Sequence, residues 1–293
     1  MSTSPTPQQM LDTLWPFLQV AASYARHLQV QIRAHPEKAG ADNPFAAALT
    51  DADLSIQTLV EVAVLGTFPH LRFYGEEEAA SYNTPYFRSR TLGPPGDYLL
   101  LLDPIDGTRF YLDGHPNYHL ILSIADADDY AAVVAIEPSQ GTYRYALRGA
   151  GAYTGSLGQP FTAAVPLRLA PPRPVVYLSG TLGHLVAPLR QYFQVVYLPT
   201  DYHPTVLVPN HTGILDGSLT GSVLAEAPWI DSAAVAFLAH EAGCVVTTLT
   251  GGRCPRCTRV RAINARGWSW APPARSISGC SRSSRRIPGR RSL

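Results

Sequence analysis

Apolar residues in the first 70 positions recur at intervals of three and four, as they do on one face of an amphipathic helix. One set lies in residues 10–33 and comprises Leu11, Leu14, Leu18, Ala21, Ala22, Ala25 and Leu28. A second set lies in residues 53–66 and comprises Leu54, Ile56, Leu59, Val60, Ala63 and Val64. We therefore predict two helices, each with one buried face, joined by a loop.

The pattern then changes to short apolar runs that are separated by turn residues. Strand candidates lie at residues 71–74, 98–102, 119–125, 131–136 and 142–147. The run at 98–102 is apolar at almost every position, which is typical of a strand buried on both faces. Because these strands follow one another after two helices, residues 1–165 predict an α+β half with an antiparallel sheet.

Strands and helices alternate in the second half of the sequence. The strand candidates are residues 175–178, 195–198 and 244–249, and the helix candidates are residues 182–192 and 229–242. This alternation predicts an α/β half over residues 166–252. The fold class is therefore α/β, and residues 253–293 form a third segment of different composition.

Composition agrees with a globular protein, since hydrophobic residues make up 46% of the 293 positions and charged residues 15%. No apolar run approaches the roughly 18 residues of a membrane-spanning helix. The polar segment Met1–Gln9 lacks the pattern of a secretion signal. We expect a cytoplasmic protein that does not associate with membranes.

Charge is divided unevenly along the chain. Residues 1–252 contain 22 acidic and 12 basic residues, whereas residues 253–293 contain 11 arginines and no acid. An acidic body suits a protein that binds divalent cations, because carboxylates are the hard oxygen ligands of such ions. A basic tail ordinarily suggests nucleic-acid binding, but we do not expect a nucleic-acid partner here.

Acidic residues occur where predicted elements begin or end. They are Asp53, the triplet Glu76, Glu77 and Glu78, the pair Asp103 and Asp106, and Asp231. Each has a purely structural explanation, because aspartate caps helices and forms turns and a glutamate triplet can be a solvated corner. Four separate structural coincidences explain the set poorly, so we treat it as a candidate site.

The segment Asp103-Pro-Ile-Asp-Gly-Thr108 carries the clearest chemistry. Asp103 follows a buried strand, where sheets of the α/β type place their ligands, and a turn would let Asp106 face the same point. A few converging carboxylates suffice for Mg²⁺, which usually keeps several waters. Gly107 lets the backbone approach a ligand closely, and a helix starting there would present free N–H groups to a phosphate.

Taken together, the motifs resemble those of the inositol monophosphatase superfamily of metal-dependent, lithium-sensitive phosphatases. The resemblance extends from about residue 10 to 252 and implies an αβαβα sandwich, commonly found as a homodimer. The matching segments are Leu49-Thr-Asp-Ala-Asp53, Gly75-Glu-Glu77, Asp103-Pro-Ile-Asp-Gly-Thr108, Gly149-Ala-Gly-Ala-Tyr153, Trp229-Ile-Asp-Ser-Ala-Ala234 and Glu241-Ala-Gly243.

The resemblance also implies roles for individual residues. The metal ligands would be Glu76, Asp103, Asp106, Asp231 and the carbonyl of Ile105, with Glu77 as a supporting acid. Asp53 and Thr108, together with Glu76, would orient the attacking water, and the amides of Gly107 and Thr108 would hold the phosphate. The implied activity is hydrolysis of a small phosphate monoester of inositol, sugar or nucleotide type, with two or three Mg²⁺ ions.

The substrate pocket departs from the family pattern. The usual Arg-x-x-Gly-Ser element is missing before Asp231, where residues 197–204 stand instead. Glu226 or Asp216 is the candidate for the acid that contacts the substrate. Alternatives therefore stay open within the family: a 3′(2′),5′-bisphosphate nucleotidase, a fructose-bisphosphatase-like enzyme or a histidinol phosphatase. A non-catalytic homologue that binds ligands is the alternative from another class.

The tail departs further, because family members finish with an apolar strand and a helix. We read the gene one base early, so that each codon takes the last base of one codon and the first two bases of the next. Trp270-Ala271 then encodes glycine, and Gly267-Trp268 encodes Leu, Met or Val. This reading returns apolar residues to the segment. We predict a frameshift near residue 252, and a tail that leaves the second half without its last strand and helix. Resequencing the gene across the codons for Gly251 to Cys257 tests this. A confirmed frame with a well-packed tail would contradict it, and a genuine nucleic-acid-binding tail is the alternative.

Overall fold

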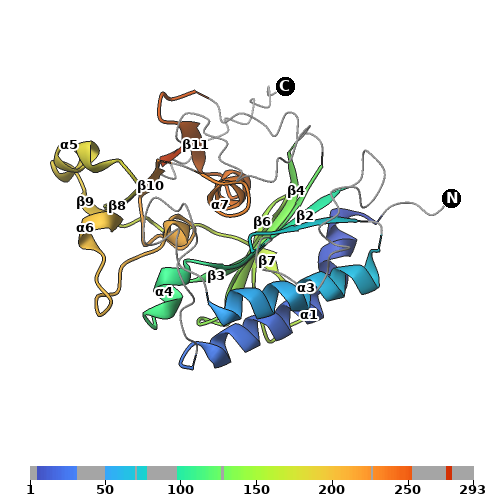
Figure 1. Cartoon of the computed structure of the whole chain (residues 1–293). Helices are drawn as coiled ribbons and strands as arrows, with labels where there is room; N and C mark the ends of the chain where they lie inside the picture. Colours follow the sequence, from blue (N-terminus) through green and yellow to red (C-terminus); the bar gives the residue numbers. More distant parts are fainter. Residues whose placement is uncertain are drawn as a thin grey trace, which may run out of the picture.

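The computed structural model describes residues 5–31, 50–69, 71–77, 98–126, 129–225, 227–252 and 275–278. Helices and two sheets alternate in five layers (Figure 1), which confirms the predicted αβαβα sandwich. One core lies between the outer helices and the first sheet, and a second core lies between that sheet and a central helix. A smaller core lies between the second sheet and the outer helix on its far side.

The outer layer on one side consists of α1 (Pro7–Leu28) and α3 (Asp51–Thr67). Both helices were predicted, and each begins two or three residues earlier than expected because its capping threonine precedes the first apolar residue. Thr6 accepts a hydrogen bond from the Gln9 N–H at 3.2 Å, and the Gln9 side chain accepts one from the Thr6 N–H at 2.9 Å. Thr50 and Asp53 form the same kind of box at the start of α3.

The first sheet contains seven strands, each paired with the next along the chain. They are β1 (Arg72–Gly75), β2 (Leu99–Asp106), β3 (His119–Ala125), β4 (Tyr130–Glu137), β5 (Thr142–Leu147), β6 (Gly151–Ser156) and β7 (Val165–Pro166). Every pair is antiparallel except β1 with β2. The predicted antiparallel sheet is thus correct for all pairs but the first, and β6 and β7 were missed because their sequences lack an apolar run.

The second sheet has the order β11-β12-β10-β8-β9. Its strands are β8 (Val175–Ser179), β9 (Gln194–Tyr197), β10 (Gly221–Leu224), β11 (Val245–Thr248) and β12 (Arg275–Ser278). The helix predicted at 182–192 is a 3₁₀ turn, Gly183–Leu185, followed by α5 (Val186–Arg190). Three short helical elements were not predicted, nor was β10: the helices are α6 (Leu198–Asp201), the 3₁₀ helix η3 (His211–Ile214) and the 3₁₀ helix η1 (Phe161–Ala163).

The prediction that the tail contributes no strand to the second half is wrong. Strand β12 lies between β10 and β11 and pairs antiparallel with both, at Gly221 with Ser278 and at Val245 with Ser278. The rest of the tail, residues 253–274 and 279–293, lies outside the described residues. The frameshift itself stays a prediction.

The central helix α7 (Ser232–Glu241) packs against β4, β5 and β6 of the first sheet. Its buried residues are mostly small, which lets the helix lie close to the sheet; they are Ala233, Ala234, Val235, Ala236, Leu238 and Ala239. At its end, the Glu241 carboxylate accepts hydrogen bonds from the N–H groups of Gly149 and Gly151 at 3.0 and 3.2 Å. Among the described residues, no helix is long and apolar enough to cross a bilayer.

Candidate active site

Strand β2 does not end at Asp103 as predicted but continues to Asp106. Its pairing with β3 is regular as far as Asp103 opposite Ile121, and it resumes with Asp106 opposite His119. Two residues of β2, Pro104 and Ile105, therefore oppose the single residue Leu120 of β3, which is a β-bulge. Residues three apart in a regular strand point to opposite faces. The bulge removes that alternation and allows Asp103 and Asp106 to face the same space.

Gly107 ends β2 and begins the short helix α4 (Thr108–Leu112). Its φ of 85° lies in the left-handed region, which favours glycine. A Cβ there would come within 3.1 Å of the Asn117 carbonyl oxygen and 3.2 Å of a Phe110 ring carbon. The sequence analysis considered a helix start here only as a condition for phosphate binding, and α4 meets that condition, since it begins at Thr108 next to the two aspartates.

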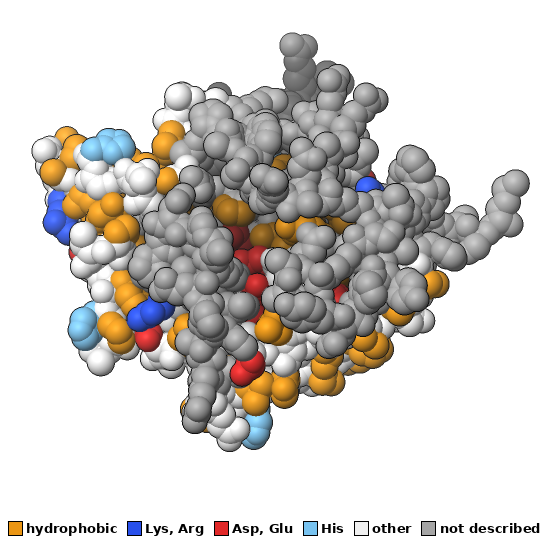
Figure 2. All heavy atoms as spheres, viewed as in Figure 1, with side chains coloured by type: hydrophobic (Ala, Val, Ile, Leu, Met, Phe, Trp, Pro, Cys, Tyr) orange, Lys and Arg blue, Asp and Glu red, His pale blue; other side chains and the backbone are white. Residues whose placement is uncertain are grey.

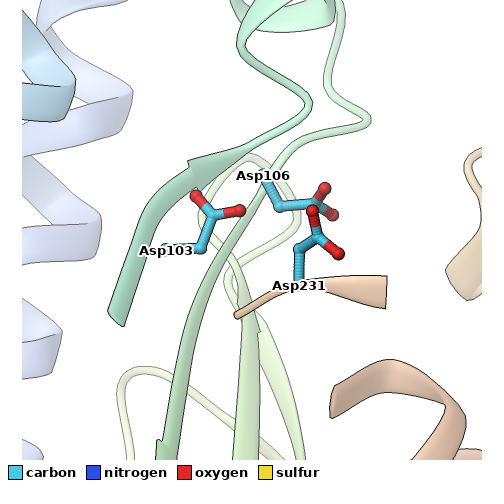
Figure 3. A group of neighbouring side chains, drawn as sticks. All are labelled: Asp103, Asp106 and Asp231. Carbon is cyan, nitrogen blue, oxygen red and sulfur yellow. The ribbon is translucent and has the colours of Figure 1, made fainter. Parts of the chain in front are cut away.

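Asp231 completes the acidic cluster from the second half of the chain. It is the N-cap residue of α7, and its carboxylate accepts a hydrogen bond from the Ser232 N–H. One oxygen each of Asp103, Asp106 and Asp231 lies within 4.8 Å of the others, and Figure 3 shows the three carboxylates converging. They line a cavity of about 390 Å³ that Glu76, Ile105, Gly107 and Thr108 line as well. Figure 2 shows acidic side chains at the centre of the visible face.

Burial and like charge make this cluster unfavourable without a cation. Burial, then the charges of Glu76, Asp106 and Asp231, raise the pKa of Asp103 well above its ordinary value. Burial and the Asp106 charge raise the pKa of Asp231 to about 8. The buried Oδ1 of Asp103 also has no hydrogen-bond partner among the described residues. An all-oxygen donor set with an unsatisfied buried oxygen fits a hard divalent cation such as Mg²⁺.

Glu76 reaches the cavity because the turn after β1 is fastened at two points. The Glu76 N–H donates to the Leu102 carbonyl at 3.0 Å, and the Glu77 N–H donates to Oε1 of Gln57, on α3, at 2.8 Å. Gly75 leaves room for that side chain, since a Cβ there would lie 2.2 Å from the Gln57 Oε1. Glu77 is buried and does not line the cavity, and Glu78 lies outside the described residues.

Asp53 and Thr108 meet, as the resemblance implied. Thr50 and not Asp53 is the N-cap residue of α3, and the Asp53 Oδ2 accepts hydrogen bonds from the Thr50 hydroxyl and N–H at 2.6 and 2.8 Å. The Asp53 Oδ1 lies 3.4 Å from the Thr108 hydroxyl, which is 2.9 Å from the Ile105 carbonyl oxygen. Asp53 therefore serves the helix cap with one oxygen and Thr108 with the other.

Of the two candidates for the substrate-contacting acid, the structure describes only Asp216. The side chain of Asp216 is 39% exposed and accepts a hydrogen bond from the Ser218 N–H at 2.8 Å. It does not line the cavity, so it has the turn-forming role that aspartate often has. Glu226 lies outside the described residues.

Sequence reasoning missed several residues at the site. Arg109, Tyr177, Asn210 and His211 line the cavity, and none belongs to a motif that drew attention. His211 is the first residue of η3 and Asn210 is its N-cap residue, and this short element has no periodic pattern. The buried ring of His211 lies 4.0 Å from Asp106 through its Nε2, and burial lowers the pKa of His211.

His119 is a second histidine that sequence reasoning missed, and it lies beside Asp106. Burial alone would lower its pKa, but contact with the carboxylates of Asp106 and Glu137 raises it to about 9. Burial has the opposite effect on a carboxyl group and alone would raise the pKa of Asp106, but the neighbouring His211 and His119 lower it. In the sequence, the one feature that marks His119 is its position as a polar residue at the start of an apolar strand.

Comparison with known proteins gives a consistent result. The family model described as the inositol monophosphatase family matches residues 12–199. A curated protein of Streptomyces griseus, named glucose-1-phosphate thymidylyltransferase, is 29% identical over 210 residues. That match covers 70% of this chain and 74% of the relative.

Solved structures share the fold at low sequence identity. An IMPase of Thermotoga maritima is 18% identical with a TM-score of 0.63, covering 84% of this chain and 88% of its own. The suppressor protein SuhB of Bartonella henselae is 17% identical with a TM-score of 0.62, covering 83% and 89%. An IMPase/NADP phosphatase complexed with NADP and Ca²⁺ is 16% identical with a TM-score of 0.65, covering 94% and 93%.

The contact between Gly75 and Gln57 predicts an effect on the metal site. Gly75→Ala should displace Gln57, free the turn that carries Glu76, and weaken Mg²⁺ binding about 10-fold, the scale of losses for groups that support ligands. Isothermal titration calorimetry measures this. Gly66→Ala is the matched control, because a Cβ there meets nothing within 4 Å. Equal Mg²⁺ affinity in the two variants would show that Gln57 does not place Glu76.

Proposed function

Because the chain belongs to the inositol monophosphatase family, we propose that it is a Mg²⁺-dependent phosphatase that hydrolyses a small phosphate monoester with an activated water. One observation carries the proposal. The convergent oxygens of Asp103, Asp106 and Asp231 lie in the same cavity as Gly107 and Thr108, where α4 begins.

The carboxylates of Asp103, Asp106, Asp231 and Glu76, with the Ile105 carbonyl, would hold the ions. Bound Mg²⁺ would supply charge neutralisation for the phosphoryl group and would lower the pKa of water. In-line hydrolysis needs no covalent intermediate on the protein. It needs a water that is held in line and a phosphate that is fixed.

Thr108 is suited to hold that water. Its hydroxyl lies 3.4 Å from the Asp53 Oδ1 and 2.9 Å from the Ile105 carbonyl, so its single proton is directed at an acceptor. The hydroxyl oxygen is then left to accept a hydrogen bond from a water in the cavity. The backbone N–H groups of Gly107 and Thr108, at the start of α4, would donate to the phosphate.

The cavity supports a substrate with an uncharged organic part. Its walls away from the carboxylates are mostly aromatic and aliphatic: Tyr74, Leu101, Phe110, Tyr177, Leu198, Leu224, Pro228, Trp229 and Ile230. Arg109 is the single arginine among the described lining residues. A volume of about 390 Å³ suits a small ligand such as a sugar, polyol or nucleoside phosphate.

A second candidate function comes from the name of the Streptomyces griseus relative, which denotes transfer of a nucleotidyl group to glucose 1-phosphate. The same name supports sugar phosphates as the first substrates to test for hydrolysis. Incubation with glucose 1-phosphate, with and without thymidine triphosphate, separates the two reactions. Release of inorganic phosphate without the nucleotide supports the phosphatase, and pyrophosphate formed only with the nucleotide supports the transferase.

Metal removal is the direct test of the mechanism. Phosphate release is measured over a panel of sugar, inositol, histidinol and nucleotide phosphates, including bisphosphates. We expect Mg²⁺ to activate the enzyme, EDTA to abolish turnover, and added Mg²⁺ to restore it. Full activity after thorough chelation would refute the mechanism. Mg²⁺ binding without turnover of any ester would favour the non-catalytic homologue.

Replacing one proposed ligand should show that the acidic cluster is needed for activity and not for the stability of the fold. Asp103→Asn removes a charge from the centre of the cluster and should lower turnover at least about 100-fold, the scale for groups that stabilise a transition state directly. Its thermal unfolding should be unchanged or improved, because a source of repulsion is gone. Asp12→Asn is the matched control and should keep full activity, because Asp12 is exposed on α1 and does not line the cavity. If Asp103→Asn retained more than roughly a tenth of the activity, Asp103 would not be an essential metal ligand.

A further inference from the structure

A row of buried and partly buried polar side chains runs from the acidic cluster across the first sheet. It begins with Asp106 at the end of β2 and continues with His119 on β3, Glu137 on β4 and Arg144 on β5. Asp106 pairs with His119 in the strand register. Ile136 pairs with Leu120, which places Glu137 beside His119, and Arg144 pairs with Ala135, two positions from Glu137. All four residues lie on neighbouring strands.

The members of the row contact one another in sequence. The His119 Nδ1 is 3.4 Å from the Asp106 Oδ2, and its Nε2 is 3.5 Å from the Glu137 Oε1. The Arg144 guanidinium contacts the same Glu137 oxygen. The Thr142 hydroxyl donates to the other oxygen of Glu137 at 2.8 Å. His119 and Glu137 are each 3% exposed. Charges buried to this extent are costly unless they are paired.

The second half of the chain fixes the same imidazole from the other side. On η3, the Thr212 hydroxyl lies 3.0 Å from the Nε2 of His119. Just before η3, the Asn210 amide nitrogen lies 3.3 Å from the Nδ1 and donates to the Asn117 carbonyl at 3.1 Å. Each ring nitrogen of His119 therefore has two polar neighbours, which restrict both its position and its rotation.

We propose that His119 is a positioning residue for the metal site: it orients the Asp106 carboxylate toward the bound cation, and Glu137 and Arg144 hold His119 in place. The proposal rests on Asp106 as a metal ligand, and hence on the proposed function. A carboxylate with one oxygen fixed by a neighbour loses less freedom when it binds a cation. Groups that orient ligands in this way typically contribute 10- to 100-fold in metal affinity. The competing explanation is that the row only joins the two halves.

Two substitutions at His119 test the role. His119→Leu removes both nitrogens, and His119→Asn keeps an amide donor near the position of the Nδ1. Mg²⁺ affinity is measured by titration calorimetry, and kcat and KM are measured as functions of Mg²⁺ concentration. We expect His119→Leu to weaken Mg²⁺ binding about 10- to 100-fold, and His119→Asn to recover part of the loss. At saturating Mg²⁺, KM for the ester should change little.

A matched control separates positioning from stability. Leu122, on the same strand, is fully buried in the core beneath α1 and α3. Leu122→Ala should lower the unfolding temperature without changing the Mg²⁺ requirement. If His119→Leu does not fold, Glu137→Gln, which leaves His119 in place, should weaken Mg²⁺ binding in the same direction by a smaller factor.

The outcomes distinguish this proposal from the proposed function. Unchanged Mg²⁺ affinity in a folded His119→Leu or Glu137→Gln variant would overturn the positioning role while the phosphatase stands. The same loss of affinity in Leu122→Ala would also overturn it. If the variants bind Mg²⁺ more weakly than the wild type, and the wild type hydrolyses no ester, the positioning role is supported and the phosphatase function is refuted. A wild-type protein that binds no Mg²⁺ would overturn both.

Discussion

Mutual repulsion of buried carboxylates is the constraint around which this molecule is organised. Asp103, Asp106, Asp231 and Glu76 come from three separate segments and share one cavity, although burial and like charge raise the pKa of Asp103 and of Asp231. The fold holds them there by backbone geometry. A bulge turns Asp103 and Asp106 to the same side, a helix cap fixes Asp231, and a turn fastened to α3 carries Glu76.

Bringing these carboxylates together lowers the stability of the fold, and it creates the site at which a cation can bind. The surrounding cores supply the free energy, since fully buried apolar side chains fill both faces of the first sheet. The site in turn uses residues that also build the fold. Asp53 completes a helix cap and contacts Thr108, so the same carboxylate belongs to the structure and to the site. A purely structural interpretation of Asp53 was therefore reasonable from sequence, because its carboxylate does complete the cap of α3, and its part in the chemistry stays a prediction.

The sequence predicted those features that depend on local pattern. The periodic apolar residues of α1 and α3 and the continuous apolar run of β2 have a strong local signal. The motif around Asp103 predicted the acidic cluster, and Asp231 lies where the resemblance placed it. Strand β10 was missed because Gly221-Ser-Val-Leu224 has only two apolar side chains. The bulge was missed because it depends on pairing with β3. His119 acquires its neighbours only through the register of three strands and the position of η3, which no local pattern contains.

The place of β12 in the second sheet has a consequence for the order of folding. Strands β1 to β7 are neighbours in the sheet as they are in the sequence, so the first sheet can assemble from contacts close along the chain. The second sheet cannot, because its interior position between β10 and β11 is filled by Arg275–Ser278. During synthesis, the edges of β10 and β11 must wait until the later segment Arg275–Ser278 has left the ribosome. Long-range pairing of this kind is slow, and it leaves unpaired edges exposed to association with other chains in the interval.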